Sequence, residues 1–128
     1  MIALTTDVVE QTAAPSIAPI EQPIDLVHLR RMTLGEHSLE REVLLLFCRQ
    51  ADMLIRRMRT AKPVVAAATA HTVKGSARGI GAWRVAAAAE AVERTATAEV
   101  AKLPAALAEL VAAIDEAKLT IAELLRAH

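Results

Sequence analysis

Aromatic residues are almost absent from this chain of 128 residues, which has one Phe, one Trp and no Tyr. Glycine and proline are also scarce, with four and five residues. An all-β fold needs more turn-forming residues than this. A surface that stacks nucleic-acid bases needs more aromatic side chains. Because the formal net charge is also zero, we do not expect the chain to bind nucleic acid.

Cysteine occurs once, at Cys48, so an intrachain disulfide is impossible. This thiol lies in an apolar run, where a buried and inert side chain is expected. The first residues lack a basic segment followed by a long apolar run, so no signal peptide is expected. No uncharged apolar run is long enough to span a bilayer. These absences favour a cytoplasmic protein that does not enter a membrane.

What the chain does contain is mostly aliphatic. Hydrophobic residues make up 54% and charged residues 23%, and the many alanines and leucines favour helix. Residues 1–22 are aperiodic and hold two prolines, so we expect a flexible N-terminal tail. Residues 23–128 are expected to form one domain. Its middle part is basic, since residues 41–94 hold ten Lys or Arg and four Asp or Glu.

Apolar residues recur at helical spacing along most of this domain. The expected helices are 24–33, 36–59, 62–79, 82–97 and 104–126, with a stop for the third at Gly79. Together they predict an all-α fold, an antiparallel four-helix bundle with a short additional N-terminal helix. Each long helix has an expected core face. The residues are Leu39, Val43, Leu46, Phe47, Leu54 and Met58 in helix 36–59, and Ala66, Ala70, Val73 and Ala77 in helix 62–79. They are Val85, Ala89, Val92 and Ala96 in helix 82–97, and Leu107, Leu110, Ile114, Ala117, Ile121 and Leu124 in helix 104–126.

The helix that contains the stretch AHTVKGSARGIGA, residues 70–82, has a second stripe, whose centre is roughly 120° away from this core face. At ~100° per residue, the stripe contains Ala67, His71, Lys74, Gly75 and Arg78. His71 is therefore expected at the surface, with Lys74 within reach of any group attached to the imidazole. Two neighbouring cations favour an anion between them, and a phosphoryl group would supply it. Gly75 costs about 1 kcal/mol relative to Ala inside a helix, which suggests that a side chain there would be in the way.

These residues resemble the histidine phosphotransfer (HPt) domain of multistep two-component signalling. The family signature, H-x-x-K-G followed six residues later by Gly, reads here as His71, Lys74, Gly75 and Gly81. The segments 24–26, 35–36 and 44–47 extend the likeness to about residues 24–125. Val73 replaces a more usual Leu, and Glu36 stands where Asp is common, but the motif itself is complete.

The resemblance implies a histidine-containing phosphocarrier. His71 would accept a phosphoryl group from a receiver-domain aspartate and relay it to another receiver. Lys74 would hold the phosphate oxygens, and Gly75 would leave room for the partner. The partners implied are receiver domains of response regulators or hybrid histidine kinases. This chain would need no cofactor and would have no ATP-dependent kinase activity, since it has no Gly-rich nucleotide loop.

Further docking contacts are expected around the histidine. Ala67 and Arg78 share its stripe, and a basic residue there suits an acidic receiver pocket. Trp83 projects roughly 150° from the expected core face of the next helix. It is either part of the docking surface or a partial lid over a helix end.

Two other functions are compatible with the same pattern. A helical adaptor could bind a partner through the His71 face without phosphorylation, and a structural bundle could dimerise through the second or last long helix. For the phosphocarrier we expect a monomer. A metal site is not expected, because His28, His37 and His128 have no acids or cysteine at ligand spacing.

Overall fold

The computed structural model describes residues 22–127. Over these residues the chain forms no strand, and its helices are α2 (Leu26–Met32), α3 (His37–Arg59), α4 (Pro63–Ile80), α5 (Trp83–Ala98), the 3-10 turn η1 (Val100–Lys102) and α6 (Leu103–Ala127). The all-α prediction is confirmed. Nearly all of the expected flexible tail, residues 1–22, lies outside the described residues, as does His128.

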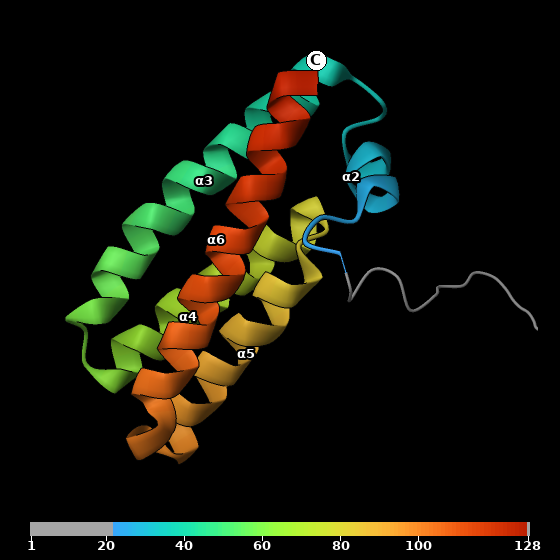
Figure 1. The fold of residues 1–128 in the computed structure, drawn as a ribbon. Coiled ribbons are helices and arrows are strands. Elements are labelled where there is room, and N and C mark those ends of the chain that lie inside the picture. Colours follow the sequence, from blue (N-terminus) through green and yellow to red (C-terminus); the bar gives the residue numbers. More distant parts are fainter. Residues whose placement is uncertain (1–21, 128) are drawn as a thin grey trace, which may run out of the picture.

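The four long helices lie side by side, and successive helices run in opposite directions (Figure 1). α4 packs against α3 and α5, and α6 packs against α5 and α3, so the four helices enclose one core. The short helix α2 lies outside this group and packs on α4. The short breaks between helices explain this neighbour-to-neighbour packing.

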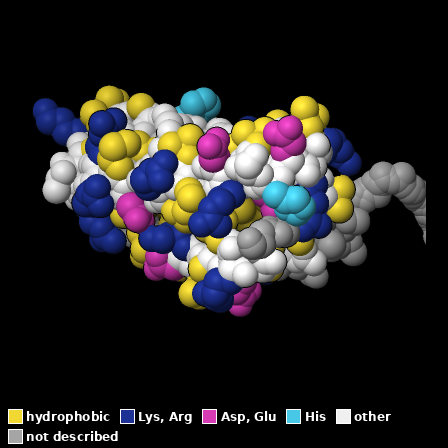
Figure 2. Space-filling view, turned by 90° about the horizontal axis from the view of Figure 1, so that it is seen from above, with side chains coloured by type: hydrophobic (Ala, Val, Ile, Leu, Met, Phe, Trp, Pro, Cys, Tyr) yellow, Lys and Arg dark blue, Asp and Glu magenta, His cyan; other side chains and the backbone are white. Residues whose placement is uncertain are grey.

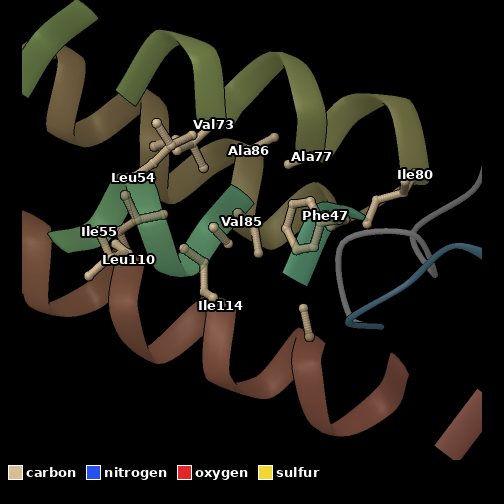
Figure 3. Close-up of a cluster of buried hydrophobic side chains, with 14 of the residues drawn as sticks. Phe47, Leu54, Ile55, Val73, Ala77, Ile80, Val85, Ala86, Leu110 and Ile114 are labelled. Atoms are coloured by element: carbon tan, nitrogen blue, oxygen red, sulfur yellow. The ribbon is translucent and has the colours of Figure 1, made fainter. Parts of the chain in front are cut away.

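Aliphatic side chains from α3, α4, α5 and α6 meet in the centre of the bundle (Figure 3). The core faces expected for α4 and α5 are buried at every position. On α6, four of the six expected residues are buried: Leu110, Ile114, Ala117 and Ile121. Leu107 and Leu124, at the two ends of the expected face, are only half-buried. The alanines of α4 and α5 are short enough to let these two helices approach closely.

The core face of α3 differs from the expected one. Leu46 was expected inside, but it is 46% exposed. The buried residues around Phe47 include Leu44, Ala51 and Ile55 instead. Leu46 is one residue before Phe47, which places it about 100° around the helix. Leu46 therefore lies off the buried face of α3. Because residues 44–46 are all leucine, the sequence does not show which of them lies on that face.

The end of α4 also differs from the prediction. Gly79 lies inside the helix, and the C-cap is Gly81, which has a φ of 78°. Its N–H points back to the carbonyls of Ala77 and Arg78, as in other left-handed helix ends. The Gly81 carbonyl accepts a hydrogen bond of 2.9 Å from the Asp25 N–H. A Cβ on Gly81 would lie 2.8 Å from the Asp25 backbone oxygen. The lack of a side chain at position 81 therefore also allows the start of α2 to pack against this turn.

Asp25 fastens α2 to the end of the α4–α5 pair. One carboxylate oxygen caps α2 by accepting from the His28 N–H at 3.2 Å, and the other accepts from Trp83 Nε1 at 2.9 Å. Burial opposes ionisation of Asp25, but the hydrogen bonds from Trp83 and His28 outweigh it and lower its pKa. The His28 ring packs against the Trp83 ring at 4.9 Å between centroids, with the two planes tilted by 59°, and its Nε2 hydrogen-bonds to the Arg78 carbonyl. Trp83 is therefore half-buried beneath α2, where it was expected to project outward.

Replacing Gly81 by Ala should destabilise the fold, and Gly79→Ala is the matched control. A side chain at position 81 must adopt a positive φ, which costs about 1–2 kcal/mol, and must also displace Asp25. At position 79 a Cβ meets no atom within 4 Å, so Ala should stabilise α4 by about 0.5–1 kcal/mol. Urea unfolding followed by circular dichroism measures both, and equal effects of the two substitutions would contradict this account.

Candidate functional site

The second stripe of α4 lies at the surface, but its five residues differ in how far they are exposed. The side chains of His71 and Arg78 are 68% and 56% exposed, and Gly75 is exposed between them. Ala67 is half-buried. The Lys74 side chain is only 13% exposed, and its ammonium contacts Glu93 on α5 and does not lie in open solvent.

A carboxylate on α5 joins His71 to Lys74. Glu93 Oε2 lies 2.9 Å from His71 Nδ1, and Glu93 Oε1 lies 2.9 Å from Lys74 Nζ. The Glu93 side chain is 29% exposed. The anion expected between the two cationic residues is therefore already supplied by the chain itself in this structure.

Sequence reasoning missed Glu93 because it is 22 positions from His71. The signal that could have found it is the symmetry of a helical hairpin. His71 and Glu93 both lie eleven positions from Ala82, between the two helices. Residues equally far from the turn of an antiparallel pair lie at the same height along it. Helical periodicity relates positions on one helix and does not relate positions on two.

Glu93 is ionised at neutral pH. The hydrogen bond from Lys74 lowers the pKa of Glu93, partial burial opposes this shift, and the bond to His71 adds to the lowering. An ionised carboxylate can only accept hydrogen bonds. The hydrogen in the contact with His71 therefore belongs to Nδ1.

This bond settles which ring nitrogen of a neutral His71 is free. With the hydrogen on Nδ1, the lone pair is on Nε2, which Glu93 does not contact. An exposed imidazole nitrogen with a free lone pair is a competent nucleophile. The arrangement can thus attack an electrophile that approaches from solvent, with an ammonium group close by to hold an anion.

The surroundings of His71 differ on its two sides. Toward α5, Arg78 is 3.6 Å from Glu90, which also lies 3.9 Å from Arg94. Toward α3, the contact is uncharged, because Ser76 Oγ donates to Gln50 Oε1 at 3.5 Å. A Cβ at Gly75 would meet no atom of the chain within 4 Å. Folding therefore does not require a glycine at position 75.

Trp83 is not brought to the histidine. It lies with Asp25 and His28 at the far end of α4, and it reaches the stripe only through the His28 bond to the Arg78 carbonyl. Within residues 22–127, no cluster of His, Cys, Asp or Glu could hold a metal ion. None of the described helices is both long and apolar enough to cross a membrane.

Comparison with known proteins gives one match. The model of the Hpt domain family matches residues 42–120. No curated protein and no solved structure matches the chain. The matched range includes α4 and α5 completely, and with them His71, Lys74, Gly75 and Glu93.

The bridge made by Glu93 should contribute to stability in a pH-dependent way. Because the pKa of Glu93 is lowered in the folded state, its contribution is present above the ordinary carboxyl pKa and is lost as the pH falls through the folded-state value. We expect Glu93→Gln to lower the unfolding free energy by up to about 1 kcal/mol at neutral pH and by less near pH 3. Urea unfolding at both pH values measures this difference.

The control for this measurement is Glu109→Gln, which removes the same charge from an exposed position on α6. It should show no such change with pH. If Glu93→Gln lowers the unfolding free energy as much near pH 3 as at neutral pH, the charge of the Glu93 carboxylate does not contribute to the stability of the contact.

Proposed function

The chain belongs to the Hpt domain family, whose members have a histidine phosphotransfer role in phosphorelays, and on this basis we propose that His71 carries the phosphoryl group. His71 accepts it on Nε2 from the aspartyl phosphate of a receiver domain and passes it to another receiver aspartate. The observation that carries the proposal is the contact between Nδ1 and the ionised Glu93 carboxylate, which leaves the exposed Nε2 with its lone pair.

Lys74 is the proposed phosphate-binding residue. It follows His71 by one helical turn, and its ammonium already binds an anion in this structure. Phosphoryl transfer depends mostly on positioning and on neutralising charge. A phosphoryl group on Nε2 carries more negative charge than a carboxylate, so Lys74 can exchange Glu93 for the phosphoryl oxygens. The catalytic groups and metal ion of the reaction belong to the receiver, and this chain acts as the carrier.

The partners proposed are receiver domains of response regulators or hybrid histidine kinases. Their docking would use Ala67, Gly75 and Arg78 along α4. Trp83 would contribute at the end of α4, where its hydrogen bond to Asp25 holds α2 in place. The exposed arginines of α3 support an acidic partner: Arg41, Arg49, Arg56, Arg57 and Arg59. Figure 2 shows Lys and Arg side chains gathered toward the left, on the side where α3 lies in Figure 1. We propose that the chain acts as a monomer in the cytoplasm.

Phosphorylation of His71 can be tested directly with a phosphorylated receiver domain. The protein should acquire phosphate that is labile in acid and stable in base, as expected for a phosphoryl group on an imidazole nitrogen. His71→Gln should remove the label, because glutamine keeps a polar side chain but has no nucleophilic nitrogen. Label that persists in the variant, or that never appears in the wild type, would refute the phosphocarrier. It would then favour an adaptor or dimerising bundle.

Docking through Arg78 predicts a salt-dependent rate. Arg78→Ala should slow phosphoryl transfer severalfold at low ionic strength, because an exposed cation steers an acidic partner toward His71. The difference should shrink as salt screens the interaction. Arg126→Ala, which removes an exposed charge from the last turn of α6, is the control. An Arg78 effect that is equal to the control at low salt would rule out this role.

A further inference from the structure

The bond between Glu93 and His71 also bears on the reaction after the phosphoryl group has been attached. In the forward step the Nε2 lone pair attacks phosphorus, the P–O bond of the donor breaks, and its electrons leave with the donor carboxylate. The ring then carries a phosphoryl group on Nε2 and a hydrogen on Nδ1, and it is positively charged. If that proton stays, the phosphoryl group can later leave from a neutral imidazole. If it is lost to water, the leaving group is an imidazolate anion, which is a poor one.

We propose that Glu93 retains the proton on Nδ1 of phosphorylated His71, and so keeps the phosphoryl group transferable and short-lived in mildly alkaline solution. The inference rests on the proposed function of His71 and deepens it. It makes Glu93 a positioning residue, since it contacts the ring but not the reacting phosphorus. A site built in this way suits rapid relay of phosphate and not its storage.

The geometry of the resting site supports this role. Glu93 shares its two oxygens between Nδ1 and Lys74 at the same distance of 2.9 Å. When Lys74 turns to the phosphoryl oxygens, Glu93 loses its ammonium partner and keeps the Nδ1–H. A half-buried carboxylate that has lost one partner depends more strongly on the other. The bond to Nδ1 is therefore reinforced when the ring carries the phosphoryl group.

The carboxylate cannot be replaced by an amide in this role. A hydrogen bond between a cationic ring and a carboxylate is roughly twice as strong as one between neutral groups. A glutamine at position 93 could still accept from Nδ1–H, so it would preserve the shape of the site. It would not favour the charged ring over the neutral one to the same extent.

Other charged groups near His71 are already paired. Those that approach from α4 and α5 are Lys74, Arg78, Glu90 and Arg94. Glu90 is shared between the two arginines and is not bonded to His71. α3 meets α4 through the uncharged Ser76–Gln50 contact, and α2 through His28, whose ring bonds to the Arg78 carbonyl. Within the described part of the chain, Glu93 is thus the carboxylate that bonds to the His71 ring.

The test loads His71 chemically, so that no partner protein is needed. With phosphoramidate as the phosphodonor, Nε2 attacks phosphorus, the P–N bond of the reagent breaks, and ammonia leaves. After removal of the reagent, loss of phosphate is followed by phosphorus NMR from about pH 6 to about pH 9. The full chain is compared with Glu93→Gln and with Glu90→Gln, which removes a carboxylate one turn away on the same helix.

We expect similar rates for all three proteins at the acidic end, where every phosphorylated ring is protonated. As the pH rises, the rate for Glu93→Gln should fall about one pH unit earlier than for the wild type, so that its phosphate lasts about tenfold longer near pH 8. Glu90→Gln should follow the wild type. If Glu93 only linked α4 to α5, its replacement would change the stability of the fold and leave the pH dependence of phosphate loss unchanged.

Three outcomes of this comparison of variants would overturn the inference. Identical pH profiles for Glu93→Gln and the wild type would remove it and leave the proposed function intact. An equal displacement in Glu90→Gln would assign the effect to net charge. Absence of acid-labile phosphate on His71 would remove the proposed function as well. A measurement on the wild type alone does not depend on any variant: nitrogen NMR of the phosphorylated ring should show Nδ1 still protonated near pH 8, and a deprotonated Nδ1 would refute the inference.

Discussion

The α4–α5 hairpin turns at Gly81, whose φ of 78° is costly for any residue with a side chain. This one glycine ends α4, accepts the backbone of Asp25 and sets where α5 begins. The start of α5 in turn decides which of its residues lies opposite His71. The contact of Glu93 with His71 and Lys74 therefore depends on the geometry of the turn as well as on these three residues. A helix end that was one residue longer would rotate the following helix by about 100° and remove Glu93 from the histidine.

The two faces of α4 serve different purposes, and the small residues of the helix divide between them. Ala70, Val73 and Ala77 are buried and hold α4 close to its neighbours. Gly75 has open space around it and contributes nothing to that packing, although a glycine inside a helix lowers its stability. The chain has many alanines elsewhere in its helices. Retaining a glycine beside an exposed histidine is consistent with an approaching partner, because close approach needs a surface without side chains.

Most of the fold could be predicted, because repeating aliphatic residues indicate both helices and their buried faces. The outward direction of His71 followed from the same periodicity. Apart from Leu46, which stands in a run of three leucines, the errors came from contacts between segments that are distant in sequence. Gly79 and Gly81 are equally good helix ends locally, and Asp25 decides between them. The periodicity of α5 alone places Trp83 on its exposed side, but Asp25, 58 residues away in the sequence, covers it and accepts its hydrogen bond. Glu93 could be found only by aligning two helices about their turn.

Glu93 also explains how the site can exist before phosphate arrives. Lys74 is largely enclosed between the helices, and an enclosed ammonium group without an anion would be costly. Glu93 neutralises it in the resting state while holding Nδ1–H of His71. Under the proposed phosphorylation of Nε2, Lys74 would exchange Glu93 for the phosphoryl oxygens and would not be left unpaired, and Glu93 would retain the hydrogen bond to Nδ1–H. The same carboxylate would then serve Lys74 before transfer and the His71 ring after it, so the proposed reaction would need little rearrangement of the site.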